Sequence, residues 1–137
     1  MRFSKTTEYA IRAMVFLTRH RDETYSVNRL HQTLDIPYKY LGRLMGNLAT
    51  AGLVIVTQGK QGGFRINLSR FPIYLADIIE VVEGLESYNR CVLGFSECSD
   101  TNPCSLHQQW SKQLENLREM IYKVQLEDLV HENMIKF

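Results

Sequence analysis

Apolar residues at helical spacing predict a first helix near the start of the chain. Ser4 is suited to cap this helix, which we expect to run to about His20. The buried face consists of residues at positions i, i+3, i+4 and i+7 of the helical repeat: Ala10, Ala13, Met14 and Leu17. A polar connection at residues 21–25 follows.

Two shorter helices joined by a tight turn are predicted next. Ser26 is a good N-cap for the second helix. Pro37 fits the first turn of the third helix, because its missing N–H is not needed there. Gly52 is a natural left-handed residue at the end of that helix. The inward-facing side chains of the pair are again apolar: Val27, Leu30, Leu34, Leu41, Leu44, Met45 and Leu48.

A β-hairpin and a fourth helix complete the predicted domain. A β-branched run at 53–57 indicates a first strand, and three glycines lie in the turn at 58–63. The second strand shows the two-residue period of a half-buried strand, with apolar side chains at Phe64, Ile66 and Leu68. A fourth helix begins after the following proline and buries one face: Leu75, Ile78, Ile79 and Val82.

A heptad pattern predicts a long helix in the last third of the chain. Its apolar residues are spaced alternately four and three apart, which is the seam along which two helices pack: Trp110, Leu114, Leu117, Ile121 and Val124. A helix on the surface of the chain's own domain would show the same pattern. That domain is already complete, so a second copy of the chain is the preferred partner.

The predicted fold class is therefore mainly α with a small β-hairpin wing. Residues 1–84 form a winged helix-turn-helix DNA-binding domain, and residues 85–104 form an irregular cysteine loop. Residues 105–137 form a dimerisation helix and a C-terminal segment.

Charge divides the chain into two unlike halves. The whole chain has a net charge of only +1, but residues 1–70 carry eleven basic and four acidic side chains, which is +7. Residues 71–137 carry five basic and eleven acidic side chains, which is −6. Basic side chains that meet phosphates release condensed counterions, so the first half suits DNA. We expect the acidic half to sense a signal or to dimerise.

The third helix and the hairpin turn hold the residues that we expect to contact DNA. The second helix of a helix-turn-helix enters the major groove by its N-terminal end. Arg43 is the best candidate there for guanine, whose O6 and N7 match the planar guanidinium. Glycines let the hairpin backbone approach a phosphate, and Lys60 can reach the minor groove or its rim. The predicted set is Tyr38, Lys39, Tyr40, Arg43, Asn47, Gln58, Lys60 and Gln61.

All three cysteines of the chain lie within fourteen residues, and a histidine follows them: Cys91, Cys98, Cys104 and His107. Three thiolates and an imidazole form a complete four-ligand set, and soft thiolates suit an iron–sulfur cluster or zinc. Zinc sites usually begin with a closely spaced cysteine pair, which this loop lacks, so a cluster is favoured. A thiol-only redox sensor, in which these cysteines form a disulfide or a sulfenic acid, stays open.

The chain resembles the IscR/NsrR family of bacterial iron–sulfur transcription regulators over nearly its whole length. The likeness rests on the cysteine loop and on five further segments: Tyr9–Met14, Ile36–Leu41, Ala51–Val54, Gly59–Phe64 and Asp77–Gly84. The resemblance implies a homodimer that binds a palindromic operator in double-stranded DNA. It also implies an iron–sulfur cluster, 2Fe–2S in preference to 4Fe–4S, near the dimer interface on Cys91, Cys98 and Cys104.

Two residues compete for the fourth ligand that the resemblance implies. Some relatives have a histidine where this chain has His107, whereas others use an acidic residue of the partner chain where this chain has Glu8. His107 is preferred, because its spacing from Cys104 needs no second chain. The ordinary alternative for Glu8 is a helical ion pair with Arg12.

The remaining sequence features set limits on function. Gln58 stands where the family often has arginine, and Gly42 stands where it often has a polar side chain, so the operator sequence stays open. With no apolar span and no signal peptide, a cytoplasmic protein is expected. We expect no enzyme and no small-molecule substrate, because no nucleophile–base pair or cofactor fingerprint is present and the other histidines are isolated: His20, His31 and His131.

Overall fold

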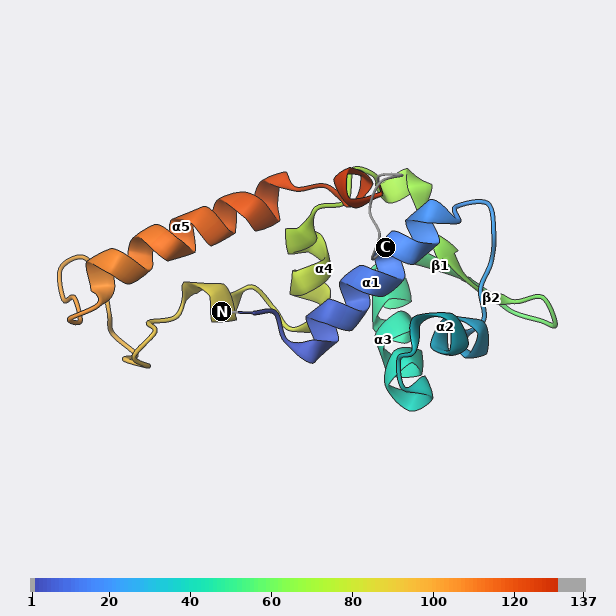
Figure 1. Ribbon diagram of the computed structural model, residues 1–137, viewed down its shortest axis with the longest axis horizontal. Helices are drawn as coiled ribbons and strands as arrows, with labels where there is room; N and C mark the ends of the chain where they lie inside the picture. The colour runs from blue at the N-terminus through green and yellow to red at the C-terminus, as the bar shows by residue number, and fades with distance from the viewer. Residues whose placement is uncertain (1, 131–137) are drawn as a thin grey trace.

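The structure is a computed structural model that describes residues 2–130 (Figure 1). Its helices are α1 (Lys5–Arg19), α2 (Val27–Leu34), α3 (Tyr38–Thr50), α4 (Leu75–Val82) and α5 (His107–Lys123). An antiparallel hairpin of β1 (Val54–Thr57) and β2 (Gly63–Ile66) lies between α3 and α4. Short 3-10 helices are η1 (Leu68–Arg70), η2 (Glu86–Asn89) and η3 (Leu126–Leu129). The predicted fold class, mainly α with a hairpin wing and a long C-terminal helix, is confirmed. Among the described helices, none has the length and apolar character needed to cross a bilayer.

The helix boundaries follow the local sequence signals closely. The Ser4 hydroxyl accepts a hydrogen bond from the Thr7 N–H at 3.2 Å, and the cap is the predicted one. The Ser26 hydroxyl caps α2 in the same way. Pro37 is the residue before α3 rather than part of its first turn, because its ψ of 132° is extended. Gly52 takes a φ of +79° just beyond the end of α3, as a left-handed C-terminal residue should.

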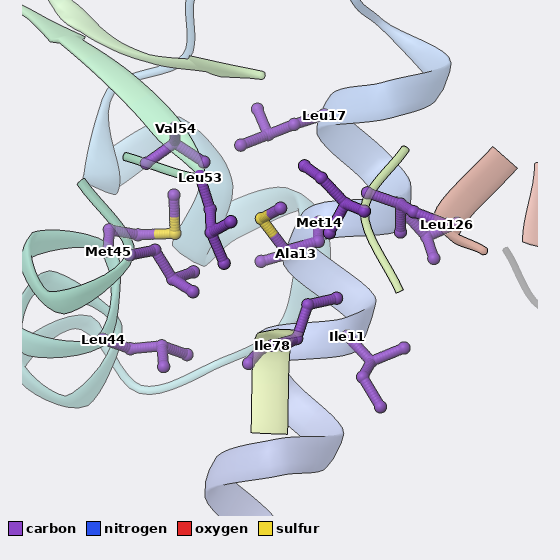
Figure 2. Close-up of a cluster of buried hydrophobic side chains, with 14 of the residues drawn as sticks. Ile11, Ala13, Met14, Leu17, Leu44, Met45, Leu53, Val54, Ile78 and Leu126 are labelled. Carbon is purple, nitrogen blue, oxygen red and sulfur yellow. The ribbon is translucent and has the colours of Figure 1, made fainter. Parts of the chain in front are cut away.

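The hydrophobic core lies where α1 meets α3, α4 and the hairpin (Figure 2). The predicted inward face of α1 is completely buried. Figure 2 shows these side chains converging with others from α3, β1 and α4: Ala13, Met14, Leu17, Leu44, Met45, Val54 and Ile78. Leu126 of η3 joins the same core from the C-terminal part of the chain, which the sequence pattern did not predict.

The hairpin is anchored to the chain before α2. Val54 pairs with Ile66 and Thr57 with Gly63. Tyr25 adds a bridge on the outer side of β2, since its N–H donates to the Phe64 carbonyl at 2.9 Å and its carbonyl accepts from the Phe64 N–H at 2.7 Å. The backbone of the wing is therefore hydrogen-bonded directly to the chain that leads into α2.

One prediction for the second strand is wrong. Leu68 was assigned to the buried side of the strand, but its side chain is 48% exposed. The strand ends at Ile66 because the Asn67 side chain accepts a hydrogen bond from the Ser69 N–H at 3.2 Å. That bond turns the chain into η1.

Helix α5 points away from the winged domain, with the cysteine loop at its far end (Figure 1). Its near end is fixed by two main-chain hydrogen bonds, from Leu75 N–H to the Val124 carbonyl at 3.1 Å and from Leu126 N–H to the Ile73 carbonyl at 2.7 Å. Ile121 is fully buried in the chain's own core.

The structure therefore divides the residues of the predicted heptad seam into those that pack in the chain's own core and those that do not. Ile121 has no surface left for a second chain in this arrangement, and Val124 follows the helix and packs against the same core. Leu114 is 8% exposed, and Trp110 and Leu117 are half-buried. The seam was assigned to a partner because periodicity alone cannot distinguish a partner chain from the helix's own domain.

Candidate metal centre and DNA-binding surface

The cysteine loop joins η2 to α5 and is held by short local hydrogen bonds. The Gly94 N–H donates to the Cys91 carbonyl at 3.0 Å, in a turn that Gly94 permits with its φ of +81°. At the other end, the His107 N–H donates to the Cys104 carbonyl at 3.1 Å as α5 begins. The Trp110 indole donates to the Arg90 carbonyl at 2.9 Å, which pins α5 beside the start of the loop. The loop thus brings residues 13 positions apart together.

The three thiols converge. The sulfur atoms of Cys91, Cys98 and Cys104 all lie within 4.8 Å of one another, and each residue is half-buried. The Cys91 and Cys104 sulfurs are 3.6 Å apart, so they are in contact without a covalent bond. Soft donors gathered at this separation fit a thiolate-bound metal ion or iron–sulfur cluster.

His107 lies beside the thiols with its ring fixed from both sides. Its Nδ1 is 3.2 Å from the Cys98 sulfur, and its Nε2 is 2.8 Å from the Asp100 carboxylate. The ring is mostly buried at 17% exposure, whereas Asp100 is 98% exposed. A hydrogen on Nε2 donated to Asp100 leaves the Nδ1 lone pair directed at the thiols, which is the arrangement common for metal-binding histidines. Sequence reasoning missed Asp100, because no spacing rule relates it to His107.

The thiols differ in acidity. Burial raises the pKa of Cys91, but hydrogen bonds from the backbone at Phe95 and Leu93 and from the other two thiols outweigh it, so the pKa falls from 9.0 to about 7. A backbone hydrogen bond at Cys104 lowers the pKa of Cys98, yet burial and the neighbouring thiols reverse the effect and raise it. The thiolate is the ligand and nucleophile, so Cys91 is more readily deprotonated than Cys98 for either role.

Glu8 is occupied within its own chain. Its carboxylate contacts Arg2 at 2.8 Å and Lys5 at 3.1 Å, and hydrogen bonds from these two side chains lower its pKa. The predicted alternative partner, Arg12, donates instead to the Leu34 carbonyl at 2.6 Å. That pairing was wrong because Arg12 reaches the C-terminal end of α2. Of the two fourth-ligand candidates, His107 is the one that this chain places beside the thiols.

The predicted DNA-contacting residues of α3 are all exposed: Tyr38, Lys39, Tyr40, Arg43 and Asn47. All of these except Tyr38 line a groove of about 400 Å³, together with Thr6 of α1 and Val82 of α4. The Tyr40 hydroxyl is hydrogen-bonded to Thr6, and its ring stands edge-on to Tyr9 at 5.5 Å. Tyr40 therefore presents a fixed hydroxyl at the edge of this groove.

The wing carries its predicted polar residues at an exposed tip: Gln58, Lys60 and Gln61. The tip is closed by a hydrogen bond from the Gly62 N–H to the Gly59 carbonyl at 3.0 Å. It projects from the end of the molecule opposite the cysteine loop (Figure 1). The residues predicted to contact DNA from the wing and the thiols therefore lie at opposite ends of one chain.

Recognition helix, wing and attached long helix together define a winged-helix transcription regulator. The chain belongs to the Rrf2 family, described as an iron-dependent transcriptional regulator, whose profile matches residues 3–132. The resemblance to IscR-type regulators is confirmed at this level, and regulators of this family bind DNA.

Individual relatives agree with this assignment. The chain is 29% identical over 133 residues to an HTH-type transcriptional regulator of Aquifex aeolicus, covering 96% of this chain and 92% of that protein. It is similar in structure to CymR (YrzC), the global cysteine regulator of B. subtilis, with a TM-score of 0.75, 25% identity and coverage of 95% and 96%. It is also similar to T. potens IscR, with a TM-score of 0.71, 26% identity and coverage of 95% and 86%.

Proposed function

We propose that this protein is a homodimeric DNA-binding regulator whose affinity for DNA depends on an iron–sulfur cluster held by Cys91, Cys98, Cys104 and His107. The observation that carries the proposal is the convergence of three thiols within 4.8 Å, with His107 Nδ1 at 3.2 Å from one of them. The iron-dependent description of the family and the likeness to IscR support iron over other metals. A bound cluster, 2Fe–2S in preference to 4Fe–4S, would supply a centre that reacts to iron supply, oxygen, nitric oxide or redox state.

The residues of this chain do three things in this proposal. The cysteines and His107 supply the ligands, with Asp100 orienting the imidazole. Trp110 ties the first turns of α5 to the start of the loop. Helix α5 then packs on α4, which contacts the DNA-facing helix α3. If the loop becomes more or less ordered, the change can therefore reach the DNA-binding surface through helices that are in direct contact. Because such a regulator binds the chromosome, we place it in the cytoplasm.

A second chain completes the proposed assembly. Phe3, Tyr88, Trp110, Leu117 and Met120 line an open cavity of about 700 Å³ along α5. We propose this face as the dimer contact. It replaces Ile121 and Val124 in that role, because both pack into the core of their own chain. A two-fold dimer would hold two α3 helices over successive major grooves of a palindromic operator. Sedimentation at several protein concentrations tests it, and a monomer at every concentration would reject it.

A cluster-free redox sensor is the second candidate, and one observation favours it. The Cys91 and Cys104 sulfurs are only 3.6 Å apart, and the pKa of Cys91 is lowered to about 7. A peroxide-class oxidant would take two electrons from this pair, and a disulfide would form with loss of two protons. Zinc is the third occupant that the same ligands would accept.

Anaerobic purification with analysis of iron, sulfide and zinc separates these possibilities. We expect a coloured protein with iron and sulfide in proportion to the chain, and loss of both in Cys98→Ser and His107→Ala. His20→Ala changes a histidine just after α1 and should keep the full cluster content. Duplex binding at fixed salt, with and without the cluster, tests regulation. Stoichiometric zinc without sulfide, or equal DNA affinity in both states, would contradict the proposal.

A further inference from the structure

We propose that the cleft between the wing turn and the start of α2 is an additional DNA contact, in which Arg29 and Lys60 bind the sugar–phosphate backbone beside the bases faced by α3. This inference rests on the proposed DNA binding and deepens it. The cleft measures about 500 Å³ and is lined by Thr24, Ser26 and Arg29 on one side and by Lys60 and Gln61 on the other. Lys60 was predicted to contact DNA from the wing, whereas nothing in the sequence pattern singled out Arg29.

The two sides of the cleft are locked together. Tyr25 and Phe64 exchange two main-chain hydrogen bonds of 2.9 and 2.7 Å between the chain before α2 and the wing. A Cβ atom at Gly63 would lie 2.4 Å from the Tyr25 carbonyl, so the two backbones are in the closest contact that glycine permits. The cleft is thus a preformed site rather than a gap between independent elements. Binding of a ligand there therefore loses little of the conformational entropy that would be lost if a mobile wing had to become ordered.

Arg29 is held in place for such a contact. Its guanidinium lies 4.3 Å above the ring of Tyr25, and its Nη1 donates to the Thr24 carbonyl at 3.4 Å. The side chain is still 56% exposed, so further N–H groups face the cleft and solvent. A planar, fixed guanidinium with unused donors is the group best suited to a phosphate.

One acidic residue at the cleft limits the attraction and gives a second test. Glu23 lines the same cleft, and its carboxylate is 3.9 Å from Arg29 and accepts a hydrogen bond from the Tyr25 hydroxyl at 2.8 Å. This carboxylate opposes an incoming phosphate. The ion pair is exposed on both sides and weak, so a phosphate diester can take over the guanidinium.

The contact is sequence-independent, so it can be measured without knowing the operator. The probe is a fluorescent mixed-sequence duplex of about 30 base pairs, or three helical turns. The full-length protein is titrated with this probe over a series of salt concentrations. One phosphate contact contributes about 0.9 to the slope of log K against log salt, which is about eightfold in affinity at about 0.1 M salt. We therefore expect Arg29→Ala and Lys60→Ala each to weaken binding about eightfold and to reduce the slope by about one.

Three further variants make the test specific. Arg29→Lys keeps the charge and should keep most of the slope. Glu23→Gln should tighten binding, because it removes the opposing charge. Lys112→Ala removes an exposed positive charge on α5 and should leave affinity and slope unchanged.

The outcomes separate this inference from the proposed function. If the wild-type protein binds no duplex at any salt concentration, the proposed function fails. If it binds, but Arg29→Ala has the wild-type affinity and slope, this inference fails alone. Equal losses in Arg29→Lys and Arg29→Ala would also overturn it, because the effect would then come from packing on Tyr25. Thermal unfolding of each variant identifies any that lose binding by losing the fold.

Discussion

Gly63 is the residue on which the joint between the wing and α2 depends most directly. Its φ is +148°, and an added Cβ would lie 2.4 Å from both the carbon and the oxygen of the Tyr25 carbonyl and 2.6 Å from the Ser26 nitrogen. These neighbours are backbone atoms, which cannot rotate away. Gly63→Ala must therefore separate β2 from the chain before α2.

The size of the effect follows from the contacts that are lost. Separation breaks the two hydrogen bonds between Tyr25 and Phe64, each contributing about 1 kcal/mol to the free energy of unfolding. A non-glycine residue in this backbone region adds a cost of about 1–2 kcal/mol. We expect Gly63→Ala to lower the free energy of unfolding by about 3–4 kcal/mol. For a chain of 137 residues this corresponds to a fall in Tm of about 10 °C.

Two other glycines are matched controls, because each isolates one part of the effect. Gly59 has a φ of +108° but no atom within 4 Å of an added Cβ. Gly59→Ala should therefore lower the free energy of unfolding only by the backbone cost of about 1–2 kcal/mol. Gly46 lies within α3 with no atom within 4 Å, so Gly46→Ala should gain up to about 1 kcal/mol of helix propensity.

Urea unfolding followed by circular dichroism measures the free energies of unfolding of the wild type and the three variants under one set of conditions. The expected order of stability is Gly46→Ala, then wild type, then Gly59→Ala, then Gly63→Ala. If Gly63→Ala is as stable as Gly59→Ala, the close approach to Tyr25 does not constrain the wing, and the reasoning is refuted.

Three further predictions concern α5 and the cysteine loop. Ile121→Ala should cost about 2–5 kcal/mol of stability in the same unfolding assay, because this side chain is fully buried, whereas Tyr122→Ala, at a 53% exposed position, should change it by less than about 0.5 kcal/mol. Trp110 is the single tryptophan and contacts the start of the loop, so its emission should change on metal loading; a change that persists without the cysteines would contradict this. Asp100→Asn should weaken metal retention against a chelator about tenfold, because Asp100 accepts the hydrogen bond that orients His107. Glu97→Gln is the control and should retain metal as the wild type does. If Asp100→Asn retains metal as well as Glu97→Gln, Asp100 does not orient the ligand.

Patterns that repeat along the chain were sufficient to predict most of the fold. The buried faces of α1 and α3, the caps at Ser4 and Ser26 and the hairpin all depend on residues close in sequence, so periodicity and capping rules identify them. The three cysteines were found for the same reason: they lie in one short loop, and the structure brings their sulfurs together.

The missed features arise from contacts between distant segments. Ile121 was assigned to a partner chain, because a heptad pattern does not show which surface covers it. Tyr25 bridges the wing through its backbone alone, which leaves no mark in the pattern of side chains. Arg29 resembled an ordinary exposed residue until that bridge placed it beside Lys60. Tertiary proximity, rather than residue type, gives these positions their roles.

The fixed near end of α5 makes this helix a lever. Its 17 residues extend about 25 Å at 1.5 Å per residue, from the core attachment at Val124 to the cysteine loop. A tilt of about 5° at the attachment moves the far end by about 2 Å over this length. A displacement of the loop is therefore smaller in amplitude where α5 meets the core. In the proposed regulation, the stiffness of this attachment at Ile73 and Val124 would determine how much of such a movement reaches α3.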